Sequence, residues 1–387
     1  MADGIGYLTI LAGGAESTSN TTVNATQRLP NLEFTPDKEY QYLLDESLQG
    51  NAFQRKPDLG VVDIRGSWRM LADYQTSSVI LKHFFGTLSG GKYSFDAALT
   101  ASLTLAIDKT VSVWELGGVF INQLVHTWGP GFSELSGTLI AMGLTYTGGQ
   151  NTATELLNLL PATARKCKSA PDLTVRLGVA SAVLSSSENI SVQSGTLTLT
   201  RPMAETHANA AREIRKPVAN GFASGGLEMA LTRYDTNQYT TWLDANTSLQ
   251  AALLYDEEGG SGTKEWYIPH LTLTTAPAPV SNADFIPQTL SANITQGEGK
   301  YTAATISAAN ADNSINDSAT SFPYIHVGAE LWTGGFTGTA TNNEKRTLVS
   351  RTTAKIVLSG GTALVDDASG ETVDVVYRNP PVYVTET

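Results

Sequence analysis

The feature that most constrains this chain is a long stretch that it carries twice. The first copy begins at Arg55 and reads RKPDLGVVDIRGSWRMLADYQT, and the second begins at Arg215 and reads RKPVANGFASGGLEMALTRYDT. The two stretches align without a gap, and identical residues such as Tyr74 and Tyr234 are 160 positions apart. Because similarity at a fixed interval indicates a repeated structural unit, we expect two diverged copies of one module.

The correspondence continues downstream at a shorter interval. The segment around Trp114 resembles the segment around Trp266, and these two residues are 152 positions apart. Because loop tips tolerate changes of length, we expect a shorter hairpin loop in the second copy. The modules then cover roughly residues 25–150 and 185–297.

Each copy has the same order of elements. An extended arm around Phe34 or Leu197 precedes a long connection, an alternating strand, a short helix, hairpin strands and a closing strand. The alternating apolar residues are Ile64, Trp68 and Met70 in copy one and Leu227, Met229 and Leu231 in copy two. We expect Thr76 and Thr236 to cap the helices, and residues 203–214 can form a further helix.

These patterns predict a mainly β protein with two tandem β-sandwich or half-barrel modules, each with a short flanking helix. We expect residues 1–165 to hold an N-terminal arm, the first module and a linker helix that Pro161 ends. Residues 166–300 form the second module. Residues 301–387 form a β-rich C-terminal extension or a small surface domain.

Composition restricts the possible partners. Charged residues make up 16% of the 387 residues, and the formal net charge of −12 argues against a protein that binds nucleic acid specifically. The single cysteine, Cys167, excludes a disulfide within the chain and fits folding in a reducing cytoplasm. We expect no signal peptide and no membrane-spanning segment.

No catalytic, cofactor or metal site is predicted. The five histidines lack metal-ligand spacing, and His83 and His270 lie in apolar patterns typical of structural residues. Trp114 and Trp266 occupy equivalent positions, which favours packing in a core over a sugar-binding face. The arginine and lysine before each repeated proline favour contact loops on a neighbouring subunit. These hypothetical contact residues are Arg55, Lys56, Pro57, Arg215, Lys216 and Pro217.

At this point the chain resembles the tail tube proteins of tailed bacteriophages. The resemblance rests on ESLQGNAFQRKPDLGVVDIRGSWRMLADYQTSSVILKHFFG, SLTLAIDKTVSVWELGGVFINQLVHTW and SGTLIAMGL in copy one, and on GFASGGLEMALTRYDTNQYTTWL and EWYIPHLTLTT in copy two. It covers roughly residues 25–297, and the last ~90 residues depart from it.

The resemblance implies a structural virion protein whose sheets join around rings that stack into a tube, through which DNA passes into the host. With two modules per chain, three chains close a pseudo-hexameric ring. The implied partners are further copies of the chain, the tape measure, terminator and baseplate or tip proteins, and passing double-stranded DNA without specific binding. The implied location is the virion tail, after assembly in the host cytoplasm.

Three alternatives remain open from the sequence. The chain can be another β-rich virion protein, such as a tube terminator or a decoration protein. It can be a carbohydrate-binding surface protein, for which only the tryptophans argue. An enzyme such as a polysaccharide hydrolase would need convergent carboxylates, and no candidate pair stands out.

Overall fold

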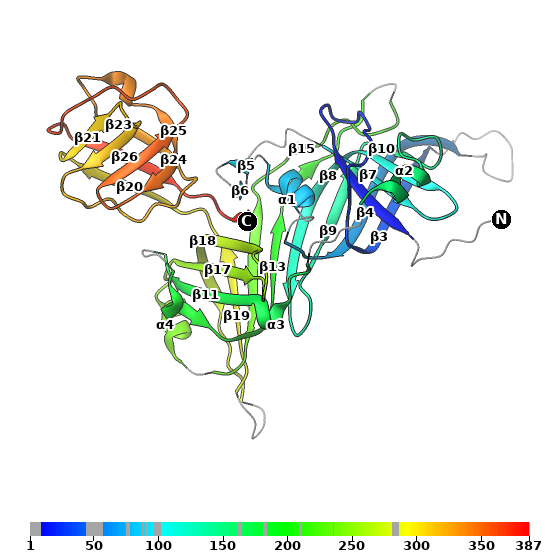
Figure 1. The fold of residues 1–387 in the computed structure, drawn as a ribbon, viewed down its shortest axis with the longest axis horizontal. Coiled ribbons are helices and arrows are strands. Elements are labelled where there is room, and N and C mark those ends of the chain that lie inside the picture. The colour runs from blue at the N-terminus through cyan, green and yellow to red at the C-terminus, as the bar shows by residue number, and fades with distance from the viewer. Residues whose placement is uncertain are drawn as a thin grey trace, which may run out of the picture. The chain divides into compact units, whose positions relative to one another are not determined.

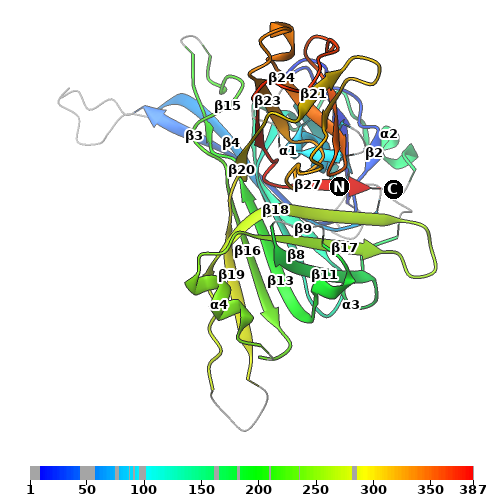
Figure 2. The same ribbon diagram turned by 90° about the vertical axis from the view of Figure 1, so that its left-hand side faces the viewer.

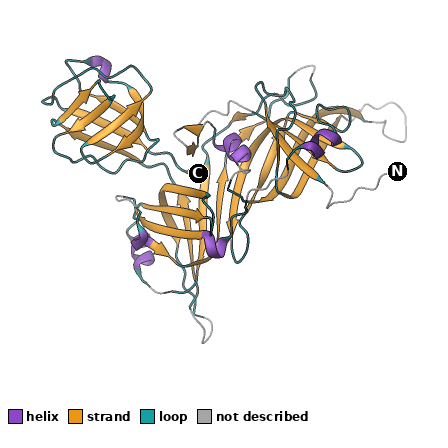
Figure 3. Cartoon of the chain, in the orientation of Figure 1, coloured by secondary structure: helices purple, strands orange, loops and turns teal. Residues whose placement is uncertain are grey.

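The computed structural model describes residues 9–43, 57–74, 78–86, 88–89, 92–95, 102–160, 165–180, 184–208, 211–234, 236–280 and 286–386. The protein is mainly β, as the sequence predicts, and of the residues that the structure describes 53% lie in strands and 9% in helices (Figure 1, Figure 3). The chain forms two compact units. Unit 1 comprises Met1–Thr87, Asp96–Pro171 and Ser194–Gly225, and unit 2 comprises Leu88–Phe95, Asp172–Gln193 and Gly226–Thr387.

Unit 1 is built on an antiparallel sheet. Its main strands are β1 (Ile10–Ala15), β3 (Asn31–Leu43), β4 (Asp58–Leu71), β7 (Leu103–Asp108), β8 (Val113–Trp128) and β9 (Glu134–Ala141). They pair in the order β1, β7, β8, β9, β4, β3. The shorter elements are β2 (Gln27–Arg28), β10 (Gly143–Thr145), β14 (Met203–Ala204), β15 (Val218–Ala219) and the helices α1 (Ser78–Phe85), α2 (Ala153–Asn158) and α3 (Ser169–Asp172).

Side-chain alternation places the core of unit 1 on one face of this sheet. The predicted apolar residues of β4, Ile64, Trp68 and Met70, are all buried, whereas the residues between them are not. Helix α1 packs against β8 and β1 and contributes buried side chains such as Phe84. Figure 2 shows β3 and β4 running side by side as a long two-stranded ribbon.

Unit 2 contains a second antiparallel sheet. Its strands are β11 (Leu173–Val179), β16 (Ser224–Leu231), β17 (Leu249–Asp256), β18 (Thr263–Thr275) and β19 (Gln288–Ile294), with α4 (Gln238–Asp244) against β18. They pair in the order β11, β17, β18, β19, β16. The minor elements are β5 (Leu88–Ser89), β6 (Lys92–Ser94), a 3₁₀ turn at Ser186–Glu188 and β12 (Asn189–Ile190). The predicted apolar residues of β16, Leu227, Met229 and Leu231, are buried.

The two sheets have the same order of pairing. β11, β17, β18, β19 and β16 correspond to β1, β7, β8, β9 and β4, and a helix follows the last of these strands along the chain in each case. A register shift interrupts β8 opposite β9 between Ile121 and Gln123, and another interrupts β18 opposite β19 between Leu273 and Thr275. Both shifts therefore fall at positions 152 residues apart, which is the interval between Trp114 and Trp266.

The length difference between the copies is not in the hairpin, which corrects the sequence-based expectation. The loop Glu257–Gly262 between β17 and β18 is longer than the loop Lys109–Ser112 between β7 and β8. The shortening lies between the helix and the next strand, where α4 is followed almost directly by β17. In the first copy the corresponding connection carries the β5–β6 hairpin.

A separate seven-stranded sheet follows β19 in unit 2. Its strands are β20 (Glu298–Ala303), β21 (Ile306–Ala309), β22 (Ser314–Asp317), β23 (Glu330–Gly334), β24 (Lys345–Arg351), β25 (Lys355–Ser359) and β26 (Val373–Arg378), with a 3₁₀ turn at Ala340–Asn342. They pair in the order β20, β26, β23, β24, β25, β22, β21. This sheet has an apolar core of its own that includes Phe336, Leu331 and Ile356.

The last strand, β27 (Tyr383–Glu386), does not join the seven-stranded sheet. It pairs with β18, where Trp266 lies opposite Val384, and with β6, where Tyr93 lies opposite Val384 on the other side. In unit 1 the short strand β10 pairs with β8 from Glu115 to Gly117, and the equivalent positions on β18 overlap by one residue with those that β27 covers. The chain thus returns to the second sheet after building the third one.

The sequence-based predictions of helices and helix caps are confirmed in some places and wrong in another. Thr152 caps α2 through a capping box with Glu155, and α2 lies where the linker helix was expected. The hydroxyl of Thr236 accepts a hydrogen bond from the Gln238 amide at 3.1 Å, although the N-cap position belongs to Asn237. Thr76 and Pro161 lie outside the described residues. Met203–Ala204 is a strand paired with β15, so the helix considered there is wrong for this segment.

Candidate functional site

Polar side chains form a row on the face of β3, β4, β9, β8 and β13 (Val192–Thr200) opposite the core of unit 1, and this row is called the polar sheet face below. The row joins residues that lie directly opposite one another on these strands. These residues are Thr35, Ser67, Thr138, Gln123 and Thr200, and all are at least partly exposed. The hydroxyls of Thr35 and Ser67 are 2.7 Å apart. The row presents short, uncharged side chains with donors and acceptors for water.

Two arginines of β4 lie on the same face, and carboxylates compensate both of them. The guanidinium of Arg69 lies 3.7 Å from the Glu33 carboxylate and 3.4 Å from the Glu134 carboxylate. Arg65 lies 3.1 Å from the carboxylate of Glu205. Exposed pairs of this kind contribute little to stability. Their main effect is electrostatic, because each of these two arginines on β4 has a carboxylate beside it that offsets its positive charge.

A second feature is a strand junction on β8. The half of β8 that extends beyond β7 pairs with β13, from Gly195 opposite Trp128 to Thr200 opposite Gln123. The Arg201 amide donates to the Asn122 carbonyl at 2.8 Å, which extends the ladder by one residue. The buried Arg201 guanidinium also donates to the Phe84 carbonyl at 3.1 Å, so it ties this strand end to α1. A strand from the start of the second repeat thereby completes the edge of the first sheet.

The segment after β13 continues along β4. The Val62 amide donates to the Arg212 carbonyl at 2.9 Å, and His207 Nε2 lies 3.2 Å from Asp63 Oδ1. The segment closes on itself where the Arg215 amide donates to the Thr206 carbonyl at 2.8 Å. It therefore packs on the first module through both main-chain and side-chain contacts.

The predicted contact residues have different positions. Arg215 and Lys216 are exposed at the end of this segment, whereas Pro217 is buried. Pro57 is partly buried and directly precedes β4. Arg55 and Lys56 lie outside the described residues. The structure does not bring the two RKP triplets into a described common site, and their role in assembly stays a prediction.

Buried acids in unit 1 have structural partners. Glu16 accepts hydrogen bonds from the hydroxyls of Ser102 and Thr104, at 2.5 and 2.8 Å, and from the Gly118 amide at 2.9 Å. Glu115 accepts hydrogen bonds from both the main-chain and side-chain nitrogens of Asn151. Each carboxylate is thus held by donors that join separate segments, which is the role expected of a buried anion in a scaffold.

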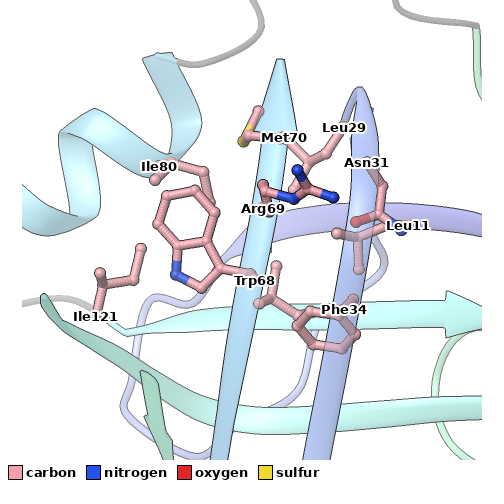
Figure 4. Close-up of a pocket in the computed structure, with 10 residues that line it drawn as sticks. Leu11, Leu29, Asn31, Phe34, Trp68, Arg69, Met70, Ile80 and Ile121 are labelled. Carbon is pink, nitrogen blue, oxygen red and sulfur yellow. The ribbon is translucent and has the colours of Figure 1, made fainter. Parts of the chain in front are cut away.

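A cavity in unit 1, lined by residues of β1, β3, β4, β7, β8 and α1, is largely apolar. Figure 4 shows Trp68 beside Ile80 and Ile121, with Phe34 and Leu11 on the other side. Its lining offers no acid–base pair. Across the described ranges, no group of three or more His, Cys, Asp or Glu side chains has metal-binding geometry. The features that stand out are therefore a polar sheet face, a strand junction and exposed sheet edges.

Comparison with family models decides which class of protein carries these features. The model described as phage tail tube protein matches residues 6–294. The chain belongs to the phage tail tube protein family. Comparison with curated proteins gives no match. As a tail tube protein, the chain is a structural component of the virion tail, and its family implies self-assembly and contacts with other tail proteins.

Tail tube proteins are typically not enzymes, which agrees with the absence of a predicted catalytic constellation. No helix in the described part of the chain is long and apolar enough to cross a membrane. Of the structural predictions, Trp266 is buried, whereas Trp114 is half-buried with the Lys109 ammonium over its ring. Cys167 is buried.

Sequence reasoning missed the residues that make this tail tube protein's internal junction. Asn122 and Arg201 are joined through main-chain atoms, and Glu205 reaches Arg65 across 140 positions of sequence. Main-chain pairing leaves no residue-type signal. The one available signal was the polar alternation of β13, in which threonines alternate with leucines as VQSGTLTLT.

Proposed function

We propose that this tail tube protein assembles as trimeric, pseudo-hexameric rings that stack into the conduit for DNA delivery. The observation that carries the proposal is the common order of strand pairing in the two sheets, with a β-bulge at the same place in each. Two copies of one module in a chain occupy two positions of a six-position ring, so three chains close it. The second and first modules are then the pseudo-equivalent halves of each subunit.

Ring closure gives a physical reason for this architecture. An open sheet edge exposes unpaired main-chain groups and favours uncontrolled association. The β8–β13 junction supports the proposal, because it already joins a strand of the second repeat to a sheet of the first. A closed ring repeats such a junction at every module boundary and leaves no lateral edge.

We assign the polar sheet face to the lumen. The row from Thr35 to Thr200 supports this assignment, because short neutral side chains offer DNA phosphates no strong binding site. Arg65 and Arg69 lie beside carboxylates, which lowers their attraction for phosphates. The net charge of −12 adds weak repulsion of DNA as a whole. Passage without specific binding follows from these properties.

The remaining parts take supporting roles in the proposal. The RKP triplets mark loops that contact neighbouring modules. The seven-stranded sheet lies outside the conduit, as a decoration or as a reinforcement of stacking. Assembly takes place in the host cytoplasm, and the tape measure, terminator and baseplate or tip proteins bind the ends or the lumen of the tube.

Electron microscopy of the purified chain tests the proposal. End-on averages are expected to show rings or tubes with three subunits and six lobes around a central hole. Rings with six complete chains would overturn the two-modules-per-chain arrangement. A monodisperse monomer that stays unassembled when tape measure and terminator proteins are added would overturn the tube function.

A further inference from the structure

We propose that the outer edge of β3 in one chain pairs, antiparallel, with residues 274–280 of a neighbouring chain, which comprise the end of β18 and the five residues that follow it. This contact would reproduce between chains the junction that β13 makes with β8 inside one chain. The proposal rests on the proposed ring and names the residues that close it. The occupant of each edge is a second copy of this chain.

The internal junction defines which main-chain groups face a partner. Because the Arg201 amide donates to the Asn122 carbonyl, the alternate residues Leu124, His126 and Trp128 also direct their amides and carbonyls toward β13. The intervening residues of β8, such as Gln123, turn their main chain toward β9. In this way one half of β8 is hydrogen-bonded on both sides.

The equivalent segment, residues 274–280, has the same orientation. β17 pairs with β18 only as far as Leu271, just as β7 pairs with β8 only as far as Val119. After the shared bulge, the Thr289 amide donates to the Pro277 carbonyl at 3.2 Å, so Pro277 faces β19. By alternation with Pro277, the amides of Ala276, Ala278 and Val280 point away from β19, while the Ala276 carbonyl also accepts a hydrogen bond from the Gln288 side chain at 3.4 Å. Within the described ranges, no strand pairs with them on that side.

The two prolines of this segment fit the assignment. Pro277 and Pro279 lack amide hydrogens, so neither can donate to a ladder. By the alternation just described, the missing hydrogens lie on the β19 side. The outward amides of Ala276, Ala278 and Val280 are retained, and Val280 is 76% exposed. The sequence TAPAPV thus ends pairing with β19 and keeps the other edge competent to receive a strand.

β3 has the matching free edge. The Leu71 amide donates to the Pro30 carbonyl, just before β3. The Thr232 amide donates to the Ser191 carbonyl, just before β13. The start of β3 beside the end of β4 is therefore equivalent to the start of β13 beside the end of β16. The Ala72 amide donates to the Ser133 carbonyl, which fixes the side of β4 that faces β9. It follows that Thr35, Asp37 and Glu39 face β4 with their main chain, and the residues between them face outward.

One residue weakens the proposed ladder. Pro36 is among the outward-facing residues of β3, so that position accepts a hydrogen bond and cannot donate one. Phe34, Lys38 and Tyr40 retain outward amides. In the described part of the chain, β3 pairs with β4 alone. A junction with one fewer hydrogen bond than the internal junction is the expected result.

The register follows from the internal junction. Leu71 and Thr232, like Pro30 and Ser191, are 161 positions apart, one more than the interval of 160 in the sequence alignment, and this structural interval also relates the buried Trp68 and Met70 to the buried Met229 and Leu231. Thr200 lies opposite Gln123, and the equivalent residues, 161 positions earlier in β3 and 152 positions later in β18, are Glu39 and Thr275. Both side chains are exposed. The pair corresponds to a non-hydrogen-bonded position of the ladder, where opposed Cα atoms lie about 4.5 Å apart. This separation permits a disulfide between cysteines placed there.

Disulfide trapping tests the inference in the full-length chain. Glu39→Cys with Thr275→Cys is expected to give a covalent trimer on non-reducing gels after mild oxidation of assembled rings. Glu33→Cys with Thr275→Cys is shifted along the strand and should give monomer. Thr200→Cys with Gln123→Cys, at the internal junction, should close within one chain and so change mobility without adding mass. The native Cys167 is buried and stays in place.

The outcomes separate the inference from the proposed function. Rings that form normally while the Glu39–Thr275 pair stays uncrosslinked would overturn the inference and leave the tube function standing. A chain that forms no rings under any condition would overturn the proposed function. A covalent ladder that continues beyond trimer would support the strand pairing and overturn closure by three chains.

Discussion

Residues 122–128 of β8 and residues 274–280, at and after the end of β18, both continue beyond the neighbouring hairpin strand but have different neighbours. On β8 this segment is paired with β13 and largely buried, with His126 and Trp128 in the interior. After β18 the equivalent residues include Ala278 and Val280 and are partly or fully exposed. The comparison teaches that two sheets with the same order of strand pairing can differ in what covers one of their edges. One edge is satisfied within the chain, and the other is available to another chain.

The largest effect is expected from proline at the satisfied edge. His126→Pro removes an amide that donates toward β13 and also removes a buried side chain. Loss of a buried ladder bond and its packing should lower the free energy of unfolding by about 3 kcal/mol. A thermal melt of the unassembled chain followed by circular dichroism measures this. An unchanged melting temperature would mean that β13 contributes little to the stability of the chain.

The matched change at the other edge, Ala278→Pro, should affect assembly instead of folding. Ala278 is 152 positions from His126 and lacks a described strand partner on its outer side. The free energy of unfolding of the unassembled chain should therefore stay within about 0.5 kcal/mol of that of the parent. The yield of rings, counted on micrographs, should fall strongly. Pro277→Ala alters the side that faces β19 and should leave the ring yield intact. Equal ring yields for the parent, Ala278→Pro and Pro277→Ala would show that the two sides of this segment do not differ in assembly.

A smaller effect is expected on the polar face. Replacing both Glu33 and Glu134 by Gln leaves Arg69 without its carboxylate neighbours, and the change in unfolding free energy should stay within about 1 kcal/mol. DNA release from virions with this tube should slow, and more so at low ionic strength, where screening is weak. The further change Arg69→Gln should restore the rate. Unaltered release in the double variant would remove this face from the lumen.

The smallest effect concerns pH and distinguishes the two sheets. His270 of β18 stands where unit 1 has Gly118, and burial lowers the pKa of His270 below its ordinary value. The Asn379 side-chain amide lies 3.0 Å from Nε2, and the Ser248 hydroxyl lies 3.0 Å from Nδ1. These partners suit a neutral ring.

The sign of the pH effect follows from linkage. The unfolded chain binds a proton at His270 near pH 6.5, whereas the folded chain does so only at lower pH. The contribution to stability is therefore complete above pH 6.5 and is lost as the pH falls from there toward the folded pKa. As the pH is lowered, hydrogen exchange should show unit 2 losing stability at a slightly higher pH than unit 1. His270→Gln should remove the difference, and a response that persists in this variant would assign it to another group.

The comparison also marks what sequence could predict. Alternation in Ile64, Met70, Leu227 and Met229 predicted buried strand faces, because side-chain direction in a strand is a local property. The mainly β class followed from such patterns, and the family followed from the resemblance of the quoted stretches and their order to tail tube proteins. The location of the length difference was missed, since an interval in sequence records the sum of changes and not their places.

The candidate site was less accessible to sequence. Main-chain partners such as Asn122 and Arg201 depend on register between distant strands, and register has no residue-type signature. The Arg65–Glu205 pair likewise depends on how the segment after β13 lies along β4. The RKP triplets were visible in the sequence because their residue types recur, but repetition alone does not say what a residue contacts.

The seven-stranded sheet has a consequence for protein engineering. Its entry strand β20 and exit strand β26 are neighbours, with Glu298 directly opposite Arg378 and their side chains 2.6 Å apart. The chain therefore leaves and re-enters the tube module at almost one point, and β27 then returns to β18. A short turn can replace the whole insert, provided that the cut spares β27. In the proposed tube, where this sheet lies outside the conduit, we expect a foreign domain whose termini lie close together to be accepted there and to be displayed at regular intervals along the tube.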